Sequence, residues 1–145
     1  MDDLLRGLRA AAEPTRLRIL ALCARAELTV SDLTQILGQS QPRVSRHLKN
    51  LVDAGLLERF REGQWAFYRL AESGPTGPLA RQVVDLIPVD EATVQQDATR
   101  LEAVKQARAE AAETYFRKNA ARWDQIRRLY VDDAEVEAAL RRLVP

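Results

Sequence analysis

Apolar residues at helical spacing, separated by proline and glycine, divide the N-terminal part of the chain into short helices. The first carries an apolar stripe that includes Leu4 and Leu8, begins with Asp2 as its expected cap and stops before Pro14. The second is expected to begin at that proline, because the first turn of a helix tolerates the missing N–H. It is apolar around much of its circumference and should therefore be buried.

The third and fourth helices have clear start and stop signals. Thr29 or Ser31 is expected to cap the third, which ends at Gly38. Ser40 is expected to cap the fourth, which runs as far as the residue before Gly55, where a left-handed residue is needed. The two helices are therefore short and joined by a tight turn.

The pattern then changes to the alternation of β-strands. Residues 57–61 and 65–70 predict two strands, with Gly63 in the turn between them. Alternation places Tyr68 and its even-numbered neighbours on one face of the hairpin. A loop rich in glycine and proline follows, and a fifth helix is expected over residues 79–87.

The C-terminal part contains neither glycine nor proline between Pro88 and Pro145, which predicts a long helix from about Glu91 to Tyr130. A final short helix is expected over residues 134–144. The apolar stripe of the long helix consists of Val94, Ala98, Leu101, Val104, Ala111, Tyr115, Trp123, Ile126 and Tyr130. The expected domains are residues 1–87 and the helical extension 88–145.

The amino-acid composition indicates which class of protein this is. The 145 residues are 46% hydrophobic and 30% charged, an ordinary globular mixture, and the formal net charge is +1. No apolar run reaches membrane-spanning length, and Asp2 and Asp3 stand where a signal peptide would have basic residues. Cys23 is the single cysteine and cannot form an internal disulfide. We expect a cytoplasmic protein without membrane contact.

The charge is unevenly distributed. Residues 41–49 contain three cations and no acid, whereas a helix face that only keeps a protein soluble usually mixes both signs. At about 100° per residue, Val44, Leu48 and Leu51 share one side of this helix. The other side consists of Pro42, Arg43, Ser45, Arg46, Lys49 and Asn50. This pattern predicts a helix-turn-helix that reads the DNA major groove; the alternative is a solvated face of an unrelated helical protein.

The hairpin supports the DNA interpretation. Arg61 and Gln64 flank its tip, where they can contact a phosphate backbone or the minor groove. Glu62, at the same tip, argues mildly against this, and the alternative is a hairpin that only covers the core.

The motifs together resemble the ArsR/SmtB family of winged-helix transcriptional repressors. The fold that this implies is mainly α, a winged helix-turn-helix with a two-strand β-hairpin wing, here with a long C-terminal helical extension. The resemblance covers roughly residues 1–87 and rests, in the order and spacing of the family, on residues 14–20, 27–33, 40–49, 55–57 and 63–68.

The resemblance implies a homodimer, an inverted-repeat operator in double-stranded DNA, and release when a small-molecule effector binds. Leu4, Leu8, the fifth helix and the long helix are the expected dimer interface. Pro42 and Arg43 replace small polar residues common in the family, so the individual base contacts stay open. The DNA-binding residues expected by position are Gln41, Pro42, Arg43, Ser45, Arg46, Lys49, Arg61 and Gln64.

Metal sensing at the positions known in the family is not expected. Thr29 and Ser31 stand where metal-sensing members have a Cys-x-Cys pair, and hydroxyls are weak ligands for soft metals. The fifth helix contains no histidine, and His47, the single histidine, is interpreted as a packing or hydrogen-bonding residue. Cys23 lies in the buried second helix, where a core role is favoured over a redox sensor. No metal or other cofactor is expected.

The extension leaves two alternatives open. Residues 115–124 and 135–140 are similar to the segment that joins an ArsR-type domain to an S-adenosylmethionine-dependent methyltransferase in fused proteins, so the chain can be the regulatory module of such a fusion. The winged helix can also be a protein-interaction adaptor. No catalytic machinery is visible, because a single histidine offers no triad and no glycine-rich cofactor loop is present. The prediction is therefore a DNA-binding transcriptional regulator, a homodimeric repressor and not an enzyme.

Overall fold

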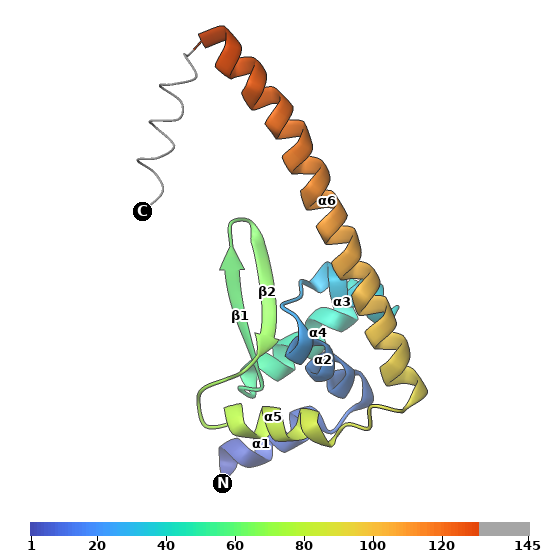
Figure 1. Ribbon diagram of the computed structural model, residues 1–145. Coiled ribbons are helices and arrows are strands. Elements are labelled where there is room, and N and C mark those ends of the chain that lie inside the picture. The colour runs from blue at the N-terminus through green and yellow to red at the C-terminus, as the bar shows by residue number, and fades with distance from the viewer. Residues whose placement is uncertain (131–145) are drawn as a thin grey trace. The chain divides into compact units, whose positions relative to one another are not determined.

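The computed structural model describes residues 1–130. Its elements follow the order of a winged helix-turn-helix, with the hairpin extending from a group of helices (Figure 1). The sequence prediction of a mainly helical fold with a two-strand wing and a long C-terminal helix is confirmed. The elements are α1 (Asp2–Ala11), α2 (Pro14–Arg25), α3 (Val30–Leu37), α4 (Gln41–Asp53), β1 (Leu57–Glu62), β2 (Trp65–Leu70), α5 (Gly77–Leu86) and α6 (Ala92–Tyr130).

Local sequence signals account for most helix ends. Pro14 opens α2, as expected. Thr29 and Asp32 form a capping box at the start of α3: the Asp32 backbone N–H donates to Thr29 Oγ1 at 3.1 Å, and the Thr29 N–H donates to Asp32 Oδ2 at 2.8 Å. Gly38 ends α3 with φ of 67°, in the left-handed region that favours glycine.

Two helix starts differ from the sequence predictions, and a third lacks the expected capping hydrogen bond. Ser40 occupies the N-cap of α4, but its hydroxyl makes no capping hydrogen bond. Met1, not Asp2, occupies the N-cap of α1, so Asp2 is the first helical residue and its charge faces the helix N-terminus. Helix α5 begins at Gly77, two residues earlier than expected, because Pro78 is tolerated in its first turn.

The wing is tied to the helix-turn-helix at its root. Strands β1 and β2 pair antiparallel, with Leu57 opposite Leu70 and Glu62 opposite Trp65. Tyr68 and Leu70, which alternation places on the same face, are both buried. The backbone of Tyr68 also pairs with Leu28, in the loop between α2 and α3, through N–H···O distances of 2.8 and 3.1 Å. The wing therefore has a fixed base next to the helices.

Residues 1–104 form one compact unit, which includes the first part of α6. Leu101 and Val104 of α6 are buried in its core, as their place in the predicted apolar stripe suggests. Arg18 of α2 forms a bidentate ion pair with Asp97 of α6, at 2.8 and 2.9 Å, and Asp97 is buried. Packing and this ion pair together fix the start of α6 against α2.

The second unit begins at Lys105 and contains the rest of α6. Its aromatic side chains Tyr115, Phe116 and Trp123 are exposed. The rings of Tyr115 and Phe116 lie edge to face, with centroids 6.1 Å apart. The short helix predicted over residues 134–144 lies outside the described residues. In the part of the chain that is described, no helix combines the length and the apolar character needed to cross a membrane.

Candidate nucleic-acid interface

The apolar side of α4 positions the helix on the core. Val44, Leu48 and Leu51 have no exposed surface and pack with residues of the other helices. This confirms the division of the helix predicted from its sequence. Because this side packs on the core, the opposite side of the helix faces away from the core.

The polar side of α4 carries exposed cations. The side chains of Arg43 and Arg46 are exposed, and within residues 1–130 neither guanidinium forms an ion pair. Lys49 is also exposed, but its ammonium pairs with Asp53 Oδ2 at 3.0 Å, which leaves it less positive potential for a partner. Gln41 and Pro42 are exposed, and Ser45 is half-buried. The first turn of α4 contains no acid.

Polar contacts from α2 hold the turn and the back of α4. Gln39, in the turn, donates from Nε2 to Thr15 Oγ1 at 3.0 Å. His47 is half-buried on α4; its Nδ1 lies 3.4 Å from Arg16 Nη1 and 3.8 Å from Glu13 Oε2. His47 is therefore a packing and hydrogen-bonding residue, as predicted. The sequence did not predict that Arg16 and Glu13 are its partners, because no sequence pattern links positions so far apart in the chain.

Electrostatics favour the neutral form of His47. Burial lowers the pKa of His47, Glu13 opposes that shift, and Arg16, Arg43 and Arg46 add to it. Burial acts to raise the pKa of Glu13, but the hydrogen bonds from the backbone N–H groups of Arg16, at 2.8 Å, and Thr15, together with the nearby charges of His47 and Arg16, lower it overall. The positive charge at this end of α4 is therefore carried by arginines.

The tip of the wing exposes further polar groups. Arg61 and Gln64 are both exposed, on either side of the turn. Trp65, beside Gln64, is 61% exposed, although it is not among the DNA-binding residues predicted from the sequence. Below the tip, Arg69 of β2 lies over the ring of Phe60 of β1, 4.6 Å from its centroid, in a cation–π contact between the two strands. The expected DNA contacts thus fall into two groups, six residues on α4 and two on the wing, and all of them except the half-buried Ser45 are exposed.

Thr29 and Ser31 stand where the resemblance implies the cysteine ligands of metal-sensing members. The hydroxyl of Thr29 is engaged in the capping box of α3, and Ser31 is exposed. Among the described residues, no group of three or more His, Cys, Asp or Glu side chains is placed to hold a metal ion. Cys23 is buried, and burial raises the pKa of its thiol to about 12, so the reactive thiolate is scarce at neutral pH.

Comparison with known proteins agrees with this geometry. The profile described as "Bacterial regulatory protein, arsR family" matches residues 13–59, which contain α2, α3 and α4. The arsenic resistance transcriptional regulator ArsR1 of Pseudomonas putida is 42% identical over 93 residues, which are 62% of this chain and 70% of that protein. The arsenical resistance operon repressor of Escherichia coli is 43% identical over 75 residues, 51% of this chain and 62% of that protein.

A solved structure shows the same fold. The homodimeric winged helix-turn-helix DNA-binding domain of a possible ArsR-family regulator from Mycobacterium bovis superposes with a TM-score of 0.51. It is 32% identical, and the match covers 59% of this chain and 77% of that one. Sequence, fold and the placement of the helix-turn-helix agree, and we conclude that this chain belongs to the ArsR family of bacterial regulatory proteins.

Proposed function

We propose that the chain is a homodimeric transcriptional repressor that binds an inverted-repeat operator through the N-terminal half of α4 and the tip of the wing. The observation that carries this proposal is the pair of exposed arginines, Arg43 and Arg46, on a helix whose opposite side is fully buried. Arginine reads guanine through two parallel hydrogen bonds and also binds phosphate. The Escherichia coli relative is named an operon repressor and the Pseudomonas putida relative a transcriptional regulator, which supports the same role.

A second set of residues supports the homodimer. Helices α1 and α5 lie side by side (Figure 1) and expose apolar side chains that one chain leaves uncovered. Leu4 and Leu8 are 45% and 44% exposed, and Leu86 of α5 is 82% exposed. We propose that a second copy covers this surface. Two-fold symmetry then sets the recognition helices about 34–36 Å apart, one turn of the duplex.

The effector of this repressor is not a metal bound at the family's cysteine positions. Thr29 already uses its hydroxyl to cap α3, and an alcohol does not replace a thiolate for soft metals. Addition of arsenite or Cd²⁺ should leave operator binding unchanged. The similarity of residues 115–124 and 135–140 to a methyltransferase linker stays a prediction.

The test is a binding titration in which the protein is added to labelled DNA from upstream of the chain's own gene. Fluorescence anisotropy measures the binding at several salt concentrations. Arg43→Ala and Arg46→Ala should each weaken binding by ~1–3 kcal/mol, roughly 5- to 150-fold, with unchanged circular dichroism. The matched control is Arg25→Ala: Arg25 is exposed at the end of α2, away from α4, and its loss removes the same charge. If both α4 variants bind as the wild type does, the proposed interface is wrong.

Sedimentation velocity tests the dimer independently of DNA. The wild type should sediment as a dimer, and Leu4→Asp/Leu8→Asp should shift it to a monomer that binds the operator more weakly. A wild-type protein that sediments as a monomer at micromolar concentration contradicts the proposed dimer.

A further inference from the structure

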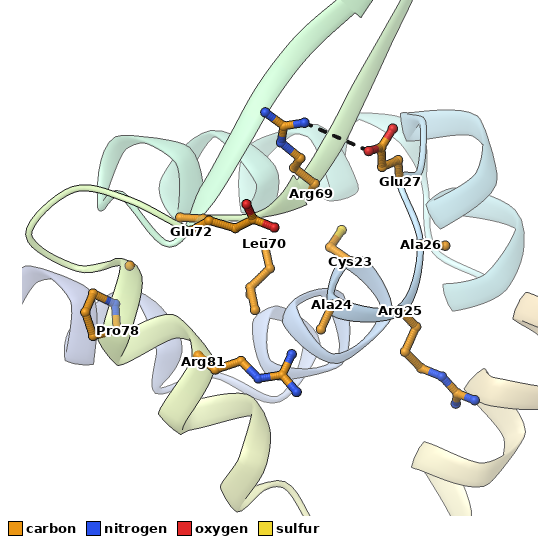
Figure 2. A pocket seen from close by; sticks show the side chains of 12 residues that line it. Cys23, Ala24, Arg25, Ala26, Glu27, Arg69, Leu70, Glu72, Pro78 and Arg81 are labelled. Carbon is orange, nitrogen blue, oxygen red and sulfur yellow. Dashed lines mark ion pairs between the residues drawn. The ribbon is translucent and has the colours of Figure 1, made fainter.

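A hollow of about 480 Å³ lies between the C-terminal end of α2, the end of β2 and the start of α5 (Figure 2). This volume is in the usual range for small-molecule sites. Cys23, Ala24, Leu70 and Pro78 give it an apolar lining. The hollow is separate from α4 and from the tip of the wing, and its role does not follow from DNA binding.

Two charged side chains of opposite sign face this lining. Glu72 extends from the residues after β2 toward Leu70 and Cys23, and Arg81 extends from α5 toward α2 (Figure 2). Within residues 1–130 the carboxylate of Glu72 has no hydrogen bond or ion pair. Arg81 has only an exposed pair with Asp85, at 3.4 Å, which is a weak interaction. Both charges are thus available to a ligand.

The other charged residues around the hollow are less available. Arg69 is held by Glu58 at 3.0 Å and by Glu27 at 3.9 Å, the second of which is the dashed line in Figure 2. The side chain of Arg25 points away from the other residues of the hollow in the same view. The two charges that remain available are therefore the carboxylate of Glu72 and the guanidinium of Arg81, whose exposed pair with Asp85 is weak.

We propose that this hollow binds a small zwitterion of the amino-acid type. A ligand carboxylate pairs with the Arg81 guanidinium through charge-assisted hydrogen bonds, a ligand ammonium pairs with Glu72, and the ligand side chain rests on Leu70. A ligand with an anion alone leaves Glu72 without a partner in the bound state. A ligand with a cation alone leaves Arg81 with only its exposed pair to Asp85. The site therefore selects for both charges on one small molecule.

The position of Glu72 links such a ligand to the wing. Glu58, on β1, accepts hydrogen bonds from the Glu72 backbone N–H and from Ser73 Oγ, both at 3.4 Å, and from Arg69 Nε at 3.0 Å. A zwitterion held between Glu72 and Arg81 thus joins the root of the wing to α5. This step rests on the repressor proposed above. There the zwitterion is the effector, because it couples the position of the wing to that of α5, which belongs to the proposed dimer surface.

Isothermal titration calorimetry of the full chain, without DNA, tests the site. The probes are L-alanine, L-leucine and L-phenylalanine, with isocaproate and isoamylamine as the leucine analogues that lack the amine and the carboxylate. At least one amino acid should bind, and each analogue should bind about tenfold more weakly than leucine, or worse. Failure of all three amino acids to bind at millimolar concentration overturns the proposal, and so does equal binding of leucine and either analogue.

Variants locate the binding. Glu72→Gln and Arg81→Gln should each weaken it by about tenfold or more, while Arg25→Gln, at the edge of the hollow, should change it less than about twofold. Unchanged binding by both Glu72→Gln and Arg81→Gln, with native circular dichroism, places the ligand elsewhere and overturns the proposal.

Repeating the operator titration with the bound amino acid separates the two proposals. A change in operator affinity supports the effector role, and linkage requires the same factor when the amino acid is titrated into the protein–DNA complex. Binding of the amino acid without any effect on operator affinity refutes the effector role and leaves the site. Binding of the amino acid by a protein that shows no specific DNA binding refutes the proposed function alone.

Discussion

Substitution of Gly55 tests how the end of α4 is built. Gly55 has φ of +76°, in the left-handed region, and a Cβ added there meets the hydroxyl of Thr76. Thr76 is buried, and its Oγ1 donates to the Ala54 carbonyl at 2.9 Å. Gly55→Ala therefore carries two penalties: a left-handed backbone for a residue with Cβ, and displacement of a buried hydroxyl from its acceptor.

The two penalties have separate magnitudes. The left-handed conformation costs ~1–2 kcal/mol for a residue other than glycine. A buried polar group that loses its hydrogen bond costs ~1–3 kcal/mol. Gly55→Ala should therefore lower the free energy of unfolding by ~2–5 kcal/mol. Gly38→Ala is the matched control, because Gly38 has φ of +67° and no atom within 4 Å of an added Cβ; it should lose only ~1–2 kcal/mol.

Urea denaturation at one fixed protein concentration measures both values, since a dimer's stability depends on concentration. In a Thr76→Ala background the hydroxyl is absent, and Gly55→Ala should then cost no more than Gly38→Ala. Equal losses for Gly55→Ala and Gly38→Ala in the wild-type background would show that Thr76 moves aside freely, and would refute the reasoning.

Three further predictions concern the first unit. Cys23 should react with iodoacetamide only at the rate of global unfolding, because it is buried and the pKa of its thiol is raised to about 12; rapid alkylation of the native protein would contradict this. Asp97→Ala should destabilise the fold by ~2–4 kcal/mol in urea denaturation, because it leaves the Arg18 guanidinium without its partner, and Asp97→Ala/Arg18→Ala should recover part of the loss. The hydrogen bond from Arg69 lowers the pKa of Glu58, so the stability that Glu58 contributes is complete above its unfolded pKa of about 4.3 and declines as the pH falls below it. The difference in unfolding free energy between the wild type and Glu58→Gln should therefore shrink from about pH 5 to pH 3, and a constant difference would be the contrary result.

The sequence could predict the roles of residues that interact only with neighbours one or two helical turns away. Pro14 opens α2, Gly38 closes α3, and the period of Val44, Leu48 and Leu51 identifies the buried side of α4. These signals are local, because a cap or a helical period depends only on neighbours a few positions away. They were sufficient for the fold class and for the direction in which the polar side of α4 faces.

Contacts between distant positions were decided by the tertiary structure alone. The sequence pattern places Asp97 only within a long helix, yet in the structure this buried residue pairs with Arg18, because two helices remote in sequence pack together there. The hollow that brings Glu72 and Arg81 to one apolar lining has no pattern in the sequence at all, since three separate elements build it. Local spacing determined what each element is, and long-range packing determined which side chains meet.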